Sequence, residues 1–329
     1  MILVKHKNQG NLKAYFYFAL EEYIMKNLLE EGKSFFFTWK IKGVVVGKHQ
    51  VLENEVNIDY LKENNIELFR RPTGGGAIYA DENNTMFSFI VNKDKKMNFR
   101  PYLQLVIDAM KKLNLEITFS GRNDLLYEDK KISGVAYLQN KYGFLIHGTY
   151  MYDVDIETMI RAITPNDEKL ISKGIDSVRN RVANLKEALN GLTLSELIEH
   201  LENEITTSVY ELSDEEEKII FEMAKKYEKR SWRFDKQPPH TKVLKKRIKG
   251  GMFNIMLDLR YGIIENIKIS GDFFNIQPVS LIENKLKNTS YNEKAIREKL
   301  KEIKLESIIV DLEKEEFMEL LLSGIIKAS

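Results

Sequence analysis

Three consecutive glycines follow a pair of arginines in the segment Arg70–Tyr79. Consecutive glycines let the backbone adopt positive φ, and they let a ligand approach main-chain N–H groups closely, as in an anion-binding nest. Arginine side chains beside such a turn can bind a phosphate or a carboxylate through two parallel hydrogen bonds. The segment therefore predicts an anion site, and a plain hairpin turn with a surface arginine pair is the alternative.

A second chemical group is the ammonium of Lys131, which precedes Ile132–Gly134 at the start of an expected strand. A lysine there could neutralise a carboxylate and a phosphate together while the two are joined. The alternative is a hairpin whose charged tip, Glu128–Lys130, carries solvated lysines. His147–Thr149 lies inside another expected strand, where the central glycine indicates close approach of another group. A histidine satisfied within the core is the alternative at that position.

Two other segments match known phosphate or metal motifs only in part. Gly43–His49 has fewer residues between its glycines than a P-loop, and it has histidine where the P-loop has the Ser or Thr that reaches magnesium. Asp153–Thr164 begins like a calcium loop but has threonine where that loop needs glycine and glutamate, so we expect a strand end and a helix cap. We expect no dedicated protein metal site.

The composition indicates a packed protein without extreme charge. The 329 residues include 50 Lys and Arg against 49 Asp and Glu, so nothing indicates a polyanion such as nucleic acid as a partner. Hydrophobic residues make up 43%, which excludes disorder for most of the chain. Cysteine is absent, which excludes disulfides, cysteine-ligated metals and thiol nucleophiles. We see no secretory signal and no membrane-spanning run, and we expect a cytoplasmic protein.

Helices and strands that would position these groups follow from the hydrophobic spacing. We expect helices at 12–30, 52–64, 101–113, 155–163, 193–206, 214–228, 278–288, 292–304 and 311–323, and strands at 35–37, 44–46, 66–69, 85–91, 143–152, 251–259 and 262–270. A helix-breaking Lys236–Pro239 and a basic stretch, Lys242–Lys249, divide the chain. We therefore expect two domains, 1–246 and 247–329.

Taken together and in this order, the three motifs resemble the lipoate–protein ligase family. Its Arg-Arg-x-Ser/Thr-Gly-Gly-Gly-Ala pattern is met by Arg70–Ala77, its Lys-Ile/Val-Ser-Gly-x-Ala pattern by Lys131–Ala136, and its His-Gly-Thr by His147–Thr149. Further similar segments extend the resemblance over nearly the whole chain; they are Gly47–Gln50, Lys173–Val182, Ser231–Phe234, Gly250–Gly251 and Gly271–Phe274.

The sequence departs from the family at Ala80–Asn84, which lacks the histidine and the glycine of the usual His-Asp-x-Gly-Asn. Asparagine can adopt the left-handed conformation at low cost, so Asn83 could keep the turn. A second departure is Asp235, where the family usually has glycine. It bears only on the geometry of the linker.

The resemblance implies a two-step reaction. ATP adenylates the carboxylate of lipoic acid with release of pyrophosphate, and a lysine of a carrier protein then attacks the lipoyl-adenylate. Lys131 is implied as the catalytic cation that contacts both ATP and lipoate, and the role of Asp124 and Asn84 stays open between binding magnesium and orienting other groups. The remaining implied contacts are Arg71, Gly74, Gly75, Gly76, Ala77, Ile78 and Tyr79 with ATP or the adenylate, and Gly75 and His147 with lipoate.

The implied fold is mixed α/β: a central mixed sheet with packed helices, similar to the biotin/lipoate ligase catalytic fold, followed by a small α+β C-terminal accessory domain. ATP and Mg²⁺ are the implied cofactors. The implied partners are lipoyl carriers, either E2 subunits of 2-oxoacid dehydrogenases or the glycine cleavage H protein, with no nucleic acid and no membrane. A cysteine-independent lipoyl or octanoyl transferase and a non-catalytic carrier-binding protein are the alternatives, and the presence of Lys131 argues against the second.

Overall fold

The computed structural model describes residues 1–7, 12–50, 52–93, 98–120, 123–163, 181–233, 242–260 and 262–325. The chain forms two compact units: the first holds Met1–Val46, Glu53–Pro72 and Ala77–Arg233, and the second holds Gly47–Leu52, Thr73–Gly76 and Phe234–Ser329. The expected break at Lys236–Pro239, together with Asp235 and most of Lys173–Val182, lies outside the described residues. The expected domain boundary between residues 246 and 247 stays a prediction.

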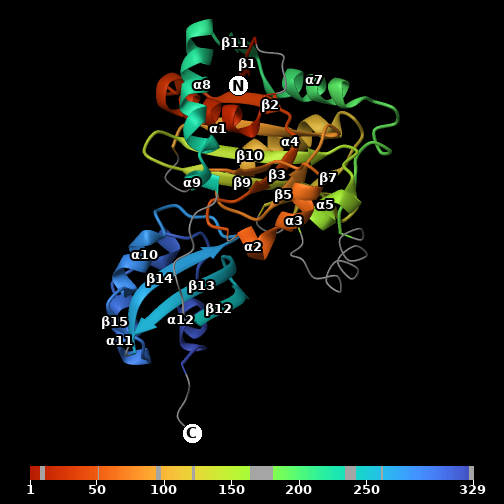
Figure 1. Cartoon of the computed structure of the whole chain (residues 1–329). Helices are drawn as coiled ribbons and strands as arrows, with labels where there is room; N and C mark the ends of the chain where they lie inside the picture. The colour runs from red at the N-terminus through yellow and green to blue at the C-terminus, as the bar shows by residue number, and fades with distance from the viewer. Residues whose placement is uncertain are drawn as a thin grey trace. The chain divides into compact units, whose positions relative to one another are not determined.

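An eight-stranded mixed sheet forms the centre of the first unit (Figure 1), in the order β11-β1-β2-β6-β10-β9-β8-β7. Strand β1 runs parallel to both of its neighbours, and the other pairs are antiparallel. The strands are β1 (Ile2–Lys5), β2 (Phe35–Trp39), β6 (Asn84–Val91), β7 (Ile117–Ser120), β8 (Asp124–Tyr127), β9 (Lys130–Gln139), β10 (Phe144–Met151) and β11 (Ser208–Glu211).

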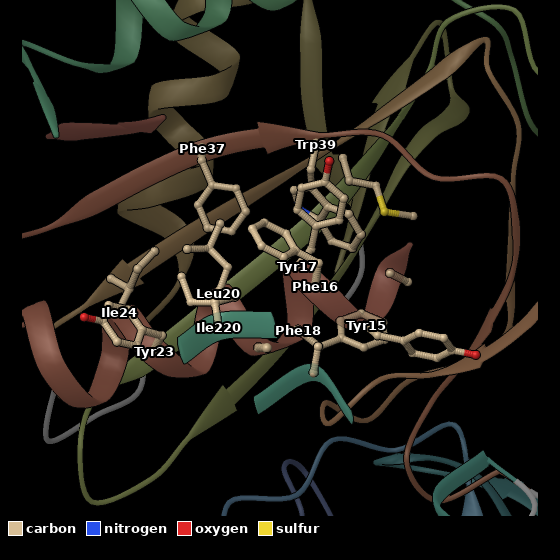
Figure 2. Close-up of a cluster of buried hydrophobic side chains, with 14 of the residues drawn as sticks. Tyr15, Phe16, Tyr17, Phe18, Leu20, Tyr23, Ile24, Phe37, Trp39 and Ile220 are labelled. Carbon is tan, nitrogen blue, oxygen red and sulfur yellow. The ribbon is translucent and has the colours of Figure 1, made fainter. Parts of the chain in front are cut away.

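Helices cover both faces of this sheet, because successive side chains of its strands point to opposite sides. Phe37 and Trp39 of β2 pack against α1 (Ala14–Tyr23), and α8 (Asp214–Glu228) packs on α1 in turn (Figure 2). On the other face, α4 (Arg100–Lys111) packs against the sheet and against α7 (Leu194–Ile205).

Helix α1 is apolar almost all round, and nine of its 10 residues are buried. A helix of this kind is a core element rather than a surface one. It continues into a π-helical turn, η1 (Ile24–Leu28), of the type that often occurs at functional sites.

A smaller sheet of the first unit has the order β4-β3-β5. Its strands are β3 (Gly43–Val46), β4 (Leu68–Arg70) and β5 (Ile78–Ala80), and the short helices α2 (Leu52–Glu55), α3 (Ile58–Glu63), α5 (Ile156–Ile163) and α9 (Arg230–Arg233) complete the described elements of this unit. The arginine and glycine motif therefore connects two strands of one sheet. At the expected helix cap before α5, Asp155 Oδ1 accepts a hydrogen bond from Thr158 N at 3.0 Å.

The second unit is built on an antiparallel sheet in the order β12-β13-β14-β15. Phe253, Ile255 and Leu257 alternate along one face of β13 and form a separate core with the helices. Its elements are β12 (Lys242–Ile248), β13 (Gly251–Arg260), β14 (Ile263–Gly271), α10 (Ser280–Leu286), β15 (Thr289–Ser290), α11 (Glu293–Leu300), the 3₁₀ turn η2 (Leu305–Ser307) and α12 (Lys314–Leu322). The expected mixed α/β fold with a small α+β part is confirmed. Within the described ranges, no helix is long and apolar enough to cross a membrane.

Candidate active site

The ammonium of Lys131 meets the carboxylate of Asp124 near the start of β9. Nζ lies 2.8 Å from Asp124 Oδ1, and the two side chains are 39% and 34% exposed, so a ligand can still reach them. The main chain of Lys131 is also fixed: its N donates to Arg181 O at 2.8 Å, and its O accepts from Ala183 N at 3.0 Å. Arg181 belongs to the family-like segment Lys173–Val182, so the described end of that segment is bonded directly to the lysine.

Strands β8 and β9 form the hairpin that was the alternative for this motif. Glu128 and Asp129 at its tip have φ of 48° and 61°, as in the tight turns that join two strands of a hairpin. Lys130 is exposed beside the tip, whereas Lys131 is only partly exposed and paired. The hairpin and the placed lysine are therefore both present.

His147 belongs to a buried polar chain that links α1, β2, β6 and β10. Glu21 Oε1 accepts from Ser88 Oγ at 2.6 Å and lies 2.8 Å from His147 Nδ1, and Trp39 Nε1 donates to Ser88 Oγ at 2.9 Å. All four side chains are buried. The Glu21 side chain, in contact with Nδ1, fixes the orientation of the ring.

Sequence reasoning missed Glu21, Ser88 and Trp39. The available signal was a carboxylate inside the apolar helix α1, because a buried charge is costly unless other groups compensate it. Glu21 Oε2 has no hydrogen-bond partner within the described residues, which marks this position as more than a packing site.

The two arginines before the glycines are buried, so the alternative of a surface arginine pair is wrong. Arg70 and Arg71 are 3% and 6% exposed. Arg71 Nη1 donates to Val45 O at 3.1 Å, and Arg70 Nε donates to Arg233 O at 3.0 Å. Burial, reinforced by the neighbouring Arg70, lowers the pKa of Arg71 to about 9, and Glu21 opposes this shift.

The three glycines belong to the second unit, where they contact the segment after β14. Gly75 has a φ of +88°, and its N donates to Phe273 O at 3.2 Å. A Cβ on Gly74 would overlap Phe273 O, and a Cβ on Gly47 would overlap Gly75 O. Glycine is therefore needed at these positions for close approach of the backbones.

The family-like segment Gly47–Gln50 contacts the same segment after β14, through His49. His49 O accepts from Gly271 N at 2.9 Å, and the His49 ring stacks on Phe273 with centroids 5.2 Å apart. His49 Nε2 lies 2.5 Å from Asn275 Oδ1. Three of the motifs that carry the resemblance are thus joined in one unit.

Asn84 and Asp81 form the turn between β5 and β6. Asn84 Oδ1 accepts from Asp81 N at 3.1 Å, while Asp81 accepts from Asn83 N at 2.9 Å and from Asp155 N at 3.0 Å. Asn83 has a negative φ, so the expectation that it replaces the missing glycine through a left-handed conformation is wrong. These side chains hold the turn instead.

Ala77, Ile78 and Tyr79 lead into and along β5 of the first unit. Burial, with a smaller effect from Asp81, raises the pKa of Tyr79 to about 12, so its hydroxyl is neutral at physiological pH. The residues that the structure describes contain no group of three or more His, Asp or Glu that could hold a metal ion.

Two family descriptions match this chain, one in each part of the sequence. The description "Lipoyl protein ligase A/B catalytic domain" matches residues 13–206, and "Bacterial lipoate protein ligase C-terminus" matches residues 237–321. Lipoate-protein ligase LplJ of Bacillus subtilis is 35% identical over 314 residues, which cover 92% of this chain and 95% of that protein. Lipoate–protein ligase 1 of Staphylococcus aureus is 34% identical over 311 residues, with the same coverage of 92% and 95%.

Solved structures of lipoate ligases have a similar fold. LipL1 of P. falciparum in complex with lipoate has a TM-score of 0.81 over 98% of each chain at 22% identity, and it shows the shared fold. A bipartite lipoate protein ligase of Thermoplasma acidophilum, studied with its E2 lipoyl domain, is 26% identical with a TM-score of 0.65, over 73% of this chain and 98% of that one. The chain belongs to the lipoate–protein ligase family, and it is an enzyme.

Proposed function

We propose that this lipoate–protein ligase uses Lys131 as the cation that brings ATP and lipoate together. The enzyme activates lipoate with ATP to lipoyl-adenylate, releasing pyrophosphate, and then transfers the lipoyl group to a lysine of a carrier protein. The lipoate carboxylate and the α-phosphate repel each other, so a positive charge between them stabilises the transition state. The observation that supports this role is the ion pair with Asp124, which holds a partly exposed ammonium in one place.

Asp124 is proposed to orient Lys131 rather than to bind magnesium, because its carboxylate already faces the ammonium. Mg²⁺ then enters with ATP as its counter-ion and neutralises part of the phosphate charge when bound. Asn84 is proposed to hold the turn after β5, since its Oδ1 already accepts a backbone hydrogen bond.

The glycine loop is proposed to bind the nucleotide. Its main-chain N–H groups suit phosphate oxygens because nothing but glycine allows such close approach. Arg71 supplies a positive charge that burial fixes in one position. The full set proposed for ATP or the adenylate is Arg71, Gly74, Gly75, Gly76, Ala77, Ile78, Tyr79 and Lys131.

The lipoate side of the site is proposed to include His147, with contributions from Gly75 and Lys131. Glu21 orients the imidazole, and Trp39 lies beside it with ring centroids 6.4 Å apart. A ring held at one end by a carboxylate and flanked by an aromatic side chain suits a substrate that combines a polar group with an apolar tail.

The proposed partners are lipoyl-carrier proteins, namely E2 subunits of 2-oxoacid dehydrogenases or the glycine cleavage H protein. The study of the Thermoplasma acidophilum ligase with its E2 lipoyl domain supports this class of acceptor. A cytoplasmic location is part of the same proposal.

Incubation with ATP, Mg²⁺ and lipoate tests the reaction. We expect mass spectrometry to detect bound lipoyl-adenylate, and pyrophosphate to be released in equal amount. A transferase that needs no ATP would form no adenylate and would contradict the proposal.

Lys131→Ala tests the central residue, with Lys130→Ala as the matched control on the adjacent exposed lysine. We expect the rate of adenylate formation to fall at least about hundredfold in Lys131→Ala and to stay near wild type in Lys130→Ala. Adenylation at the wild-type rate by Lys131→Ala would show that the assignment of this lysine is wrong.

A further inference from the structure

Lys131 lies on the face of β9 opposite to the one that a regular strand would give it. Successive side chains of a strand alternate between two faces, so Lys131 should share a face with Ser133 and lie opposite Gly134. Instead, a Cβ placed on Gly134 would lie 3.1 Å from Lys131 Nζ and 3.2 Å from Lys131 Cε. The lysine side chain therefore lies across Gly134.

An irregularity in β9 explains this change of face. Leu125 of β8 pairs with Ser133, whereas the next residue, Leu126, pairs with Lys131. Ile132 is therefore the extra residue of a β-bulge, and it is fully buried, which anchors the bulge in the core. Bulges next to active sites re-aim side chains, and this one turns the lysine toward the face of Gly134.

On that face the lysine meets Asp124, which pairs with Gly134 across the two strands. The lysine passes beside the α-carbon of Gly134 and reaches Asp124 Oδ1 at 2.8 Å. The φ of Gly134 is not in the left-handed region, so the backbone conformation does not require glycine. Apart from the chain neighbours Ser133 and Val135, Lys131 alone among the described residues has atoms within 4 Å of the missing Cβ. The space that the lysine occupies is therefore the reason for glycine at this position.

Gly134 is also held from both sides, so it does not easily move away from the lysine. Its N donates to Thr149 Oγ1 at 3.3 Å. At the following residue, Val135 N donates to Asn123 O at 2.9 Å, and Val135 O accepts from Asn123 Nδ2 at 2.8 Å. The His-Gly-Thr motif thus supports the lysine motif through the hydroxyl of Thr149.

We propose that Gly134 is a positioning residue for Lys131. Because Gly134 has no side chain, there is space on β9 for the end of the Lys131 side chain. The β-bulge and Asp124 hold the ammonium in this space. This inference rests on the proposed catalytic role of Lys131 and extends it to a residue that acts through the lysine. A Cβ at position 134 meets the end of the Lys131 side chain and, apart from its chain neighbours, no other described residue, so we expect alanine there to act mainly on the position of the ammonium.

Steady-state kinetics of pyrophosphate release test the proposal in Gly134→Ala and Gly134→Val. Misplacing a catalytic group by about 1 Å can cost about hundredfold in rate. We expect kcat to fall about tenfold with alanine and about hundredfold with valine, while KM for ATP and for lipoate changes little, because the displaced charge acts mainly in the transition state. A wild-type kcat in folded Gly134→Val overturns the proposal, and if the valine variant does not fold, Gly134→Ala decides.

A double-mutant cycle separates an effect through the lysine from a general effect on the strand. The probe is a non-reactive sulfamoyl analogue of lipoyl-adenylate, whose Kd is measured by calorimetry for wild type, Gly134→Ala, Lys131→Ala and the double variant. We expect alanine at position 134 to weaken binding in the wild-type background and to have no further effect in the Lys131→Ala background. Equal losses in both backgrounds overturn the inference.

The two proposals fail in different ways. Wild-type adenylation by Lys131→Ala would refute the catalytic role of the lysine itself. Loss of adenylation in Lys131→Ala together with normal kcat in both Gly134 variants would refute only the positioning role of Gly134.

Discussion

Glu21→Gln tests whether the buried carboxylate of α1 serves the substrate. Glutamine has the same shape, so its Oε1 can still accept from Ser88 and His147. However, the charge is lost, and an amide NH₂ replaces Oε2, which has no hydrogen-bond partner among the described residues. A buried donor without an acceptor costs about 1–3 kcal/mol, and hydrogen bonds to a neutral acceptor are about half as strong as those to a charged one. We therefore expect the free energy of unfolding to fall by about 2–4 kcal/mol.

The same variant is expected to weaken lipoate binding. The neutral glutamine oxygen holds the His147 ring less firmly than the carboxylate does, and a weakening of the oriented contact with lipoate by about 1.4 kcal/mol raises KM for lipoate about tenfold. KM for ATP should stay near wild type. Urea unfolding gives the stability, and pyrophosphate release at varied lipoate concentration gives KM.

Ser88→Ala is the matched control, because it removes the bonds of Ser88 Oγ to Trp39 and to Glu21 but keeps the Glu21 carboxylate beside His147. It leaves Trp39 Nε1 without its acceptor, so we expect a stability loss of about 1–3 kcal/mol with KM for lipoate unchanged. An unchanged KM in Glu21→Gln, or an equal rise in both variants, would refute the reasoning that Glu21 acts on lipoate through His147.

Three further perturbations test other parts of the structure. Gly75→Val should weaken ATP binding at least about tenfold in a calorimetric titration, because a β-branched residue is strained at a φ of +88° and covers the N–H groups. The control is Gly262→Val, at a φ of +73° in open space, which should lower the stability of the protein but not its affinity for ATP. Burial raises the pKa of Tyr17 from 10.0 to about 12. The neutral Tyr17 therefore contributes fully to the free energy of unfolding below pH 10, and about 3 kcal/mol of this contribution is lost as the pH rises toward 12. Between pH 10 and 12, the free energy of unfolding should fall less steeply with pH in Tyr17→Phe than in the wild type. Thr149→Val, which removes the acceptor for Gly134 N, should lower kcat for adenylation, and Thr149→Ser should restore it.

Much of the fold was predictable because the hydrophobic spacing of this sequence is strong. The expected helix at 214–228 has the bounds of α8, which begins with a capping box between Ser213 and Glu216. Strand β11 was not predicted, since it is short and three of its four residues are exposed, with no alternation to mark it. Its place at the edge of the sheet comes from pairing with β1, which lies far away in the sequence.

The candidate site could be proposed from the sequence only because several motifs occur together and in order. The glycine loop and the Lys131 motif each have an ordinary alternative when taken alone, a turn in the first case and the charged tip of a hairpin in the second. Glu21 was not predictable as a partner of His147, because the two residues are 126 positions apart and meet only through packing of α1 on the sheet. The β-bulge at Ile132 was equally hidden, since strand alternation in the sequence places Lys131 on the wrong face.

The hydrogen bond from Gly75 to Phe273 has a consequence for nucleotide binding. One backbone N–H makes one strong hydrogen bond, and in this structure the N–H of Gly75 already has an acceptor. If a phosphate takes that donor, the carbonyl of Phe273 must give it up, so the net gain is only the difference between two acceptors. Nucleotide binding at the loop is then an exchange reaction, and it should loosen the turn after β14. Faster amide hydrogen exchange around residues 271–275 in the presence of ATP would show that the hydrogen bond from Gly75 to Phe273 is broken when the nucleotide binds.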